Sequence, residues 1–449
     1  MKQTRSKFSN WFRNSITARM LIVGFLLLVL LIPLGFVKNL IQERAYRQTE
    51  VVNEINEKWG NDVILSGPII KIPYKTYKKE TVFNKETKKY FTKTNTIVHH
   101  MFVLPEKLDI QSKVTSKKLN RSIYESVVYT ANIDFTGNLP KIDFSDKDIN
   151  SKDIEWDKIS LLVKTSNLKG IRNTLEIKLN EQSLKMNPIY DNENLNTIQS
   201  GFIKNISEST NTAFPFSFNI EINGSESLKF IPLGKETIAS MESNWHSPSF
   251  DGKFLPEDGS REITSEGFKA SWKILQINRQ FQQSFKDDLP NLTSFAFGTN
   301  LIIPIDEYQK SERSAKYGFM VIGLTLLVFL LIQLVSRIHI HPFQYVMIGL
   351  ALVMFYTLLI SISEHSSFFK AYAIASASVL LLITLYSRAI LKGLKFPLLV
   401  CGSLASLYGF IYIIIQLENY ALLAGSIGLF MILAIVMYTS RKIDWNKED

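Results

Sequence analysis

The sequence contains a single cysteine among 449 residues, Cys401, which lies inside an apolar segment. An intramolecular disulfide is therefore impossible, and no zinc site can be built on cysteine ligands alone. A long chain without disulfides fits a compartment where proteins do not rely on them. It would be unusual for a small eukaryotic secreted domain.

Motifs for nucleotides and nucleic acids are also missing. The chain has no Gly-x4-Gly-Lys-Ser/Thr pattern, so ATP hydrolysis is not indicated. No RNA- or DNA-binding motif accompanies the net charge of +10, and we expect no nucleic acid partner. Much of the basic excess lies beside apolar segments, where lysine and arginine set topology and contact anionic headgroups. Membrane lipids are therefore the expected partners of this charge.

Long apolar runs are concentrated near the two ends of the chain. The first covers residues 20–37, about the length of the roughly 20-residue helix that a bilayer requires. Five lysine and arginine residues precede it and no small-x-small cleavage site follows, so we predict an uncleaved anchor rather than a removed signal peptide. A bundle of five more spans is predicted within residues 316–438, at about 318–335, 343–361, 371–387, 396–416 and 420–438.

The distribution of basic residues predicts an orientation for these spans. Four basic regions fall on one side of the membrane: residues 1–19, the loops at Arg337 and Arg388, and the tail 439–449. The positive-inside rule makes that side the cytoplasm. Arg313 and Lys316, next to the second span, are exceptions on the outer side. The prediction is a multi-pass protein of a bacterial inner (cytoplasmic) membrane, with both termini cytoplasmic and residues 38–315 periplasmic.

The region after the anchor begins with a helical pattern. Residues 40–59 carry apolar side chains at mostly helical spacing, which predicts a stalk that extends the anchor helix. Gly67-Pro68 is expected to break this stalk.

Beyond the stalk the pattern changes to short alternating runs with turn residues between them. Period-two alternation indicates half-buried strands of an antiparallel sheet. Asn223-Gly224 is a hairpin signal, and residues 75–95 and 144–157 are expected to be exposed hairpins or loops. The fold class is a mixed membrane protein whose large extracytoplasmic domain is antiparallel and β-sandwich-like, with two sheets and more than ten strands. Clear strand patterns occur at 174–179, 216–222 and 268–274.

The outer end of the third span carries Glu364 and His365. A carboxylate and an imidazole are costly where a helix leaves the membrane unless they are paired or hydrated. One interpretation is a binding site that responds to protons or substrate. The preferred one is structural: Glu364 forms an ion pair with an outer cation, Arg313 or Lys316, and so ties the exit segment of the external domain to the bundle.

A second candidate binding segment contains Trp245, His246 and Phe250 among turn residues. Aromatic rings offer large apolar contacts, so this loop could bind the edge of a glycan or lipid. It could equally plug one end of the sandwich. Ser243 with His246 lacks a visible third member of a triad, so we assign no catalytic residue and expect no enzyme.

The sequence offers few candidate metal ligands and few charged residues within the predicted spans. His339 and His341 form an H-x-H pattern, but the candidate third ligand, His365, lies about 24 residues further along one helix, roughly 36 Å away. His341-Pro342 is better read as the start of a helix, so we expect no metal and no cofactor. The spans contain almost no charged residues, which weakens a transporter interpretation without excluding it.

Several segments together resemble the inner-membrane CreD family, usually described as cell-envelope integrity proteins. The resemblance covers nearly the whole chain. It implies a role in envelope integrity or stress, expression under a two-component sensor, and altered tolerance to colicins and envelope-targeting antibiotics, with no established reaction. It is carried by Gly67–Tyr74, Arg121–Tyr124, Tyr129, Gly137, Ser243–Phe250, Gly252, Leu255-Pro256, Gly267–Trp272, Asp306–Tyr308, Arg313–Tyr317, His341–Tyr345, Phe355-Tyr356 and Ser361–His365.

The expected function is therefore non-enzymatic binding of an envelope glycan, lipid or protein by the external domain. The alternative is transport or lipid handling, in which the bundle passes an amphipathic molecule to that domain.

Overall fold

The computed structural model describes residues 16–84, 89–141, 149–191, 194–206, 213–303, 307–336, 338–391, 393–417 and 420–441. The predicted basic regions at 1–15, Arg337 and 442–449, and the loop residues 142–148, lie outside these ranges. The chain forms two compact units. A helical unit comprises residues 1–49 with 305–449, and a β unit comprises residues 50–304.

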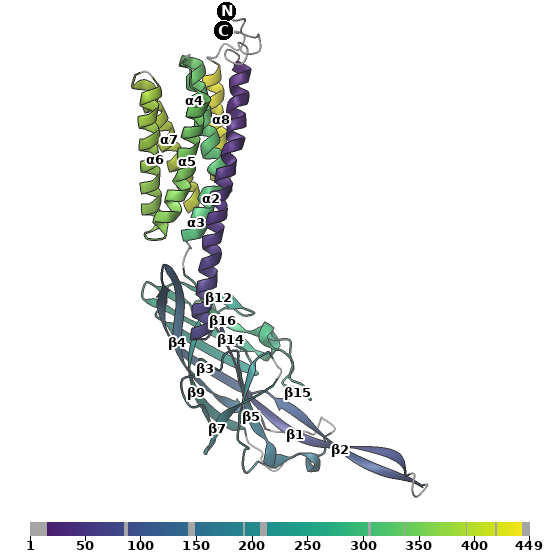
Figure 1. The fold of residues 1–449 in the computed structure, drawn as a ribbon. Coiled ribbons are helices and arrows are strands. Elements are labelled where there is room, and N and C mark those ends of the chain that lie inside the picture. The colour runs from purple at the N-terminus through teal and green to yellow at the C-terminus, as the bar shows by residue number, and fades with distance from the viewer. Residues whose placement is uncertain are drawn as a thin grey trace, which may run out of the picture. The chain divides into compact units, whose positions relative to one another are not determined.

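Within the described residues, six helices are long and apolar enough to cross a membrane (Figure 1). The N-terminal apolar helix and the five C-terminal apolar helices confirm the predicted helical part of the fold. A short polar helix, α3 (Glu307–Lys316), precedes the C-terminal five. The six are α2 (Ile16–Trp59), α4 (Gly318–Ser336), α5 (Pro342–Ser363), α6 (Phe368–Ile390), α7 (Lys395–Gln416) and α8 (Ala421–Ser440).

The helix α2 is continuous over 44 residues, so the predicted stalk is helical. It ends at Trp59, where Gly60 adopts a φ of 139° and Asn61 a φ of 56°. Glycine reaches such positive φ values without the steric cost of a Cβ atom. The helix ends at the residue where the predicted stalk ends, but the expected break at Gly67-Pro68 is wrong, because these two residues lie inside the first strand.

Two glycines in the helical unit allow α2 to pack closely. A Cβ atom at Gly349 of α5 would lie 2.1 Å from Leu30, and one at Gly318 of α4 would lie 2.8 Å from Leu34. Small residues at helix interfaces in membranes let helices approach in this way. Leu30 and Leu34 are accordingly almost completely buried.

The β unit contains sixteen strands within its described residues, some of them labelled in Figure 1. They are β1 (Val63–Asn84), β2 (Lys89–Val103), β3 (Lys107–Arg121), β4 (Tyr124–Leu139), β5 (Ser160–Thr165), β6 (Glu176–Leu179), β7 (Gln182–Ile189), β8 (Asn196–Ser200), β9 (Phe214–Ser225), β10 (Ser227–Phe230), β11 (Glu236–Ser243), β12 (Pro248–Gly252), β13 (Glu262–Thr264), β14 (Gly267–Leu275), β15 (Ser284–Lys286) and β16 (Phe297–Leu301).

These strands follow one hydrogen-bonded order, β12-β16-β10-β1-β5-β8-β7-β6-β9-β4-β3-β11-β14-β13, with β2 beside β1 and β15 beside β2. The pairs β1–β10 and β3–β11 are parallel and the others are antiparallel. Strand β7 joins two halves, because its residues 182–185 pair with β6 and its residues 186–189 pair with β8. The predicted β-rich domain is confirmed as a large, mixed and mostly antiparallel sheet.

The hydrophobic core lies between these two halves of the sheet. The ring of Phe135 in β4 contacts that of Phe230 in β10, with centroids 6.1 Å apart. The ring of Trp272 in β14 contacts that of Phe297 in β16, at 5.6 Å. Neither pair of strands is hydrogen bonded, so the two halves pack face to face like a sandwich. The alternating pattern of β3, β4 and β11 places one set of side chains in this core and the other set in solvent.

The predicted hairpin at Asn223-Gly224 is wrong. Both residues lie within β9, in antiparallel register with Thr130 and Tyr129 of β4. A Cβ atom at Gly224 would lie 2.3 Å from the Tyr129 hydroxyl oxygen. The glycine therefore makes room for a buried ring rather than for a turn.

Candidate functional site

The aromatic segment predicted as a binding candidate is largely built into the core of the β unit. Trp245 is 5% exposed, and its indole Nε1 donates hydrogen bonds to the carbonyl oxygens of Ser247 and Ile302, each at 3.1 Å. Phe250 is half-buried and packs edge-on against Phe268. His246 is the exposed member of the predicted trio. This geometry matches the alternative in which the segment plugs one end of the sandwich.

In the helical unit, Glu364 follows the last turn of α5 and lies beside a cation from α2. Its Oε1 is 3.6 Å from Nη1 of Arg44, and the Tyr308 hydroxyl donates a hydrogen bond to the same oxygen at 3.4 Å. Lys316 pairs instead with Glu312, one turn earlier in α3, at 3.7 Å. His365 is exposed.

The ion pair of Glu364 therefore differs from the suggested pair with Arg313 or Lys316. The difference arises because α2 continues without a break past its apolar segment. Arg44 lies seven residues beyond the predicted end of the span, roughly 10 Å along the helix. The prediction named only Arg313 and Lys316, which adjoin the second span, and missed Arg44 in the predicted stalk.

Charge reversal tests the pairing of Arg44 with Glu364. We expect Arg44→Glu and Glu364→Arg each to lower the free energy of unfolding of the helical unit by about 0.2–1 kcal/mol, because the arginine is half exposed and the pair is screened. The double reversal should recover most of that loss. The measurement is thermal unfolding of the purified protein in detergent, in which the reaction of a thiol dye with Cys401 reports unfolding.

The control for this cycle is Arg313→Glu. Its effect should add to that of Glu364→Arg without coupling, as expected for residues that share no contact. Rescue of Glu364→Arg by Arg313→Glu, and not by Arg44→Glu, would contradict the observed pair of Arg44 with Glu364. It would favour the predicted pair of Arg313 with Glu364.

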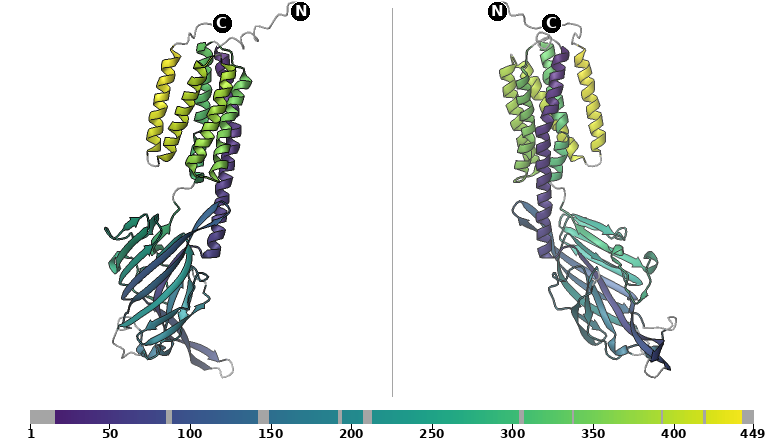
Figure 2. Two further views of the ribbon diagram at one scale, coloured as in Figure 1. Left: turned by 90° about the vertical axis from the view of Figure 1, so that its left-hand side faces the viewer. Right: turned by 45° about the vertical axis from the view of Figure 1, so that its right-hand side comes forward.

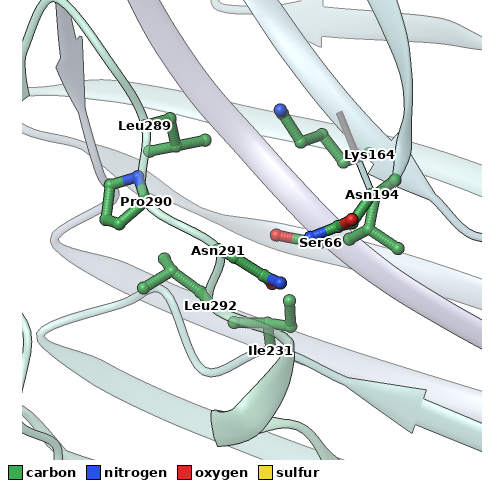
Figure 3. A pocket seen from close by; sticks show the side chains of 9 residues that line it. Ser66, Lys164, Asn194, Ile231, Leu289, Pro290, Asn291 and Leu292 are labelled. Carbon is green, nitrogen blue, oxygen red and sulfur yellow. The ribbon is translucent and has the colours of Figure 1, made fainter. Parts of the chain in front are cut away.

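The β unit contains a small cleft between β1, β5 and the loop at 289–292 (Figure 3). One wall is apolar and includes Ile231, Leu289 and Leu292; the other carries Ser66 and Lys164. The Lys164 side chain lies within this wall and is 5% exposed. The cleft volume of about 190 Å³ is below the range of roughly 300–1,000 Å³ that small-molecule sites usually have. It can hold one chemical group rather than a whole ligand.

A longer polar groove crosses the solvent face of β3, β4, β11 and β14. It encloses about 480 Å³. A second hollow of about 410 Å³ follows along β3, β4 and β11, because Asp109, Thr136 and Ile238 are the next residues on the same face of those strands. We call these two hollows the polar groove. The first is lined by Gln111, Ser112, Lys113, Asn132, Asp134, Ser240, Met241, Glu242, Ser260, Lys269, Ala270 and Ser271.

Hydrogen bonds hold several side chains of the polar groove in place. The Asn219 amide donates to Oδ1 of Asn132 at 2.5 Å and to Oδ1 of Asp134 at 2.8 Å. Across the groove, Nζ of Lys269 lies 3.5 Å from Oε1 of Glu242. The groove thus presents fixed amide, carboxylate and ammonium groups beside hydroxyls. Such a set suits a ligand with many hydroxyl and amide groups, since each needs a partner once it leaves water.

Sequence reasoning missed the polar groove. Its residues are the ordinary solvent-facing half of an alternating strand pattern. Only the parallel pairing of β3 with β11 brings Gln111 opposite Ser240 and Lys113 opposite Glu242. Pairing of strands that are distant in sequence cannot be read from one chain, so no local signal was available. Among the described residues, no group of three histidine, cysteine, aspartate or glutamate side chains is placed to hold a metal ion.

The last turns of α2 belong to the β unit and are fixed to it by polar contacts. Asn56 donates a hydrogen bond to Oε1 of Glu226 at 2.7 Å and accepts one from Ser126 at 2.7 Å. The Trp59 indole donates to the carbonyl oxygen of Tyr129. Burial raises the pKa of the Glu226 carboxyl, although the hydrogen bond from Asn56 acts in the opposite direction. These contacts hold the base of the helix against β4.

Comparison with known proteins assigns the family. A family model described as inner membrane protein CreD matches residues 15–446. The chain belongs to the CreD family. Inner membrane protein CreD of Escherichia coli (strain K12) is 28% identical over 424 residues, which cover 93% of this chain and 91% of that protein. The resemblance predicted from the sequence is confirmed, and the CreD-family chain is an inner membrane protein with six candidate spans in the part that the structure describes.

Proposed function

We propose that this CreD-family protein supports the integrity of the cell envelope by binding rather than by catalysis. In this proposal both termini are cytoplasmic and the β unit lies on the periplasmic side. There it binds an envelope glycan in the polar groove. The helical unit anchors the protein in the inner membrane.

The charge pattern supports this orientation. Arg388 lies in the last turn of α6 and Arg441 directly follows α8, so with six spans they fall on the same side as the basic N-terminal segment. Lysine and arginine in short loops accumulate on the cytoplasmic side. The connection that holds residues 50–304 then falls on the other side.

The polar groove is the observation that carries the proposed ligand class. A glycan presents hydroxyl and acetamido groups along an extended chain, and the groove offers donors and acceptors on four neighbouring strands. Because Asn219 already fixes Asn132 and Asp134, little side-chain freedom is lost when a ligand binds.

Lipid handling is the second candidate, and the cleft in Figure 3 favours it through its apolar and polar walls. Its volume of about 190 Å³ is too small for a lipid body by comparison with ordinary ligand sites. The polar groove is larger and contains more hydrogen-bonding groups, so glycan binding is preferred.

Binding to purified peptidoglycan sacculi tests the proposal. The full-length protein in lipid nanodiscs is sedimented with sacculi, and the bound fraction is measured. We expect the double variant Asp134→Ala/Asn219→Ala to bind at least about tenfold more weakly, because two or more hydrogen bonds of roughly 0.5–1.5 kcal/mol each are lost.

The matched control is Asn187→Ala/Asp191→Ala, which removes one amide and one carboxylate of the β unit outside the groove. It should bind like the unmodified protein. Equal binding by both double variants, or no binding by the unmodified protein, would overturn the proposed ligand. A specific lipid that co-purifies with the protein and is lost in a Lys164→Met variant would favour the second candidate.

A further inference from the structure

Strands β1 and β2 extend beyond the rest of the β unit as a two-stranded ribbon, which Figures 1 and 2 show from three directions. Their pairing continues to Asn84 and Lys89. In the described residues, β5 pairs with β1 only as far as Lys71, and β15 pairs with β2 only at residues 101–103. In the sheet, therefore, the only strand partner of residues 75–84 among the described residues is the segment 89–98. We call this ribbon the arm. Its ten residue pairs span roughly 33 Å.

One face of the arm is aromatic and exposed. Tyr77, Phe83 and Tyr90 are 54%, 46% and 74% exposed, respectively. Phe83 is directly opposite Tyr90, and their ring centroids are 5.0 Å apart. Tyr77 points to the same face, since it is six residues from Phe83 and side chains alternate along a strand. Val98, 48% exposed and opposite Lys75, continues this face.

Such exposure calls for a partner. An isolated two-stranded hairpin is marginally stable in water, and grouped apolar side chains on a surface mark interaction sites. The aromatic residues of the arm do not contribute to the core, which lies between the two halves of the sheet.

The charge of the arm indicates the nature of that partner. Residues 75–84 and 89–98 contain five lysines and one glutamate. Lys75 pairs with Glu155 at 3.1 Å and Lys78 with Glu80 at 3.6 Å, which leaves a clear cationic excess along the ribbon. The partner should therefore be anionic and should also accept aromatic rings.

We infer that the arm lies with its aromatic face on a bilayer surface that contains anionic phospholipid. Tyrosine is favoured at the headgroup level, where one end of its ring is apolar and the other is hydrated. Lysine near an anionic leaflet contributes about 1 kcal/mol. A soluble polyanion would satisfy the lysines but would leave Tyr77, Phe83 and Tyr90 in water. This contact is independent of the polar groove, which lies on other strands.

Vesicle binding by the full-length protein tests the inference. The protein is placed in phosphatidylcholine nanodiscs and mixed with separate vesicles of phosphatidylcholine, either alone or with phosphatidylglycerol. Co-sedimentation is expected only with the anionic vesicles. Lys79→Gln/Lys93→Gln should weaken it by at least about fivefold, because Lys79 lies on the same face as Tyr77 and a lysine near an anionic leaflet contributes about 1 kcal/mol. This difference should shrink at high salt.

The triple variant Tyr77→Ser/Phe83→Ser/Tyr90→Ser should lose at least about tenfold in binding, and high salt should not remove that difference. Lys178→Gln/Lys185→Gln, on other strands of the β unit, is the charge-matched control and should behave like the unmodified protein. Equal losses in this control and in the arm lysine variant would overturn the inference, as would equal binding to neutral vesicles. Binding to inorganic polyphosphate without binding to anionic vesicles would assign the arm to a soluble polyanion instead.

Discussion

Replacement of Arg279 by methionine should lower the free energy of unfolding of the β unit by about 2–4 kcal/mol. Arg279 is 5% exposed. Its Nη2 donates to the carbonyl oxygens of Leu233 and Gly234 at 3.0 and 3.1 Å, and also to the Gln283 side chain. The guanidinium group stacks on the Phe281 ring at 4.1 Å. One side chain thus joins the turn before β11 to the loop after β14.

The expected loss of stability in Arg279→Met follows from the hydrogen bonds that methionine cannot make. Burial lowers the pKa of Arg279 to about 10, so the group stays charged at neutral pH and its hydrogen bonds are charge-assisted. Methionine fills similar space but removes the charge-assisted hydrogen bonds to two buried carbonyl oxygens, of which that of Leu233 keeps a second donor in Gln283. A hydrogen bond to a charged group contributes about 1.5–3 kcal/mol. Lysine should not restore stability, because it cannot reproduce the planar fork of donors.

Urea unfolding of the full-length protein, followed by tryptophan fluorescence, measures this loss. Arg261→Met, at an exposed position of the same unit, is the matched control and should change stability by no more than about 0.5 kcal/mol. A midpoint for Arg279→Met equal to that of the control would show that the buried guanidinium does not hold these loops.

The second large effect is expected in the helical unit, where Gly349→Leu should destabilise the packing of α2 against α5. The nearest atom to a Cβ at this position is a methyl carbon of Leu30, at 2.1 Å. Overpacking of this kind costs about 1–3 kcal/mol, and a branched side chain cannot turn away from the interface. Leu30→Ala should partly rescue Gly349→Leu, because it vacates the same space.

Thermal unfolding in detergent, reported by the Cys401 thiol, is the measurement for this prediction. Gly409→Leu is the control, because a Cβ at Gly409 in α7 meets nothing within 4 Å. Its midpoint should be unchanged or slightly raised, since leucine favours a helix more than glycine does. If Gly349→Leu is as stable as Gly409→Leu, the close contact between α2 and α5 is not required.

The helical part of the fold could be predicted from the sequence because a bilayer imposes one strong rule. Each span needs about 20 apolar residues, and the predicted runs differ from α4 to α8 by only a few residues at each end. The β-rich character was also predictable, because alternation at 216–222 and 268–274 depends on each strand alone.

What could not be predicted depends on contacts between distant parts of the chain. The parallel pairs β1–β10 and β3–β11, the second of which builds the polar groove, join strands that are more than 100 residues apart in sequence. At Asn223-Gly224 a local turn signal failed because the ring of Tyr129 occupies the space beside Gly224. Arg44 was overlooked for a related reason, since only the three-dimensional packing of the helical unit brings it to Glu364.

The orientation of the β unit is the central claim of the proposed function, and cysteine labelling in intact cells tests it most directly. In a Cys401→Ser background, single cysteines are placed by Ile277→Cys, at a residue that is 89% exposed in the β unit, and by Arg441→Cys, after α8. A membrane-impermeant maleimide is then added. The proposal predicts that Ile277→Cys reacts in intact cells and that Arg441→Cys reacts only after the cells are permeabilised. The reverse pattern would place the β unit in the cytoplasm and contradict the proposed role in the envelope.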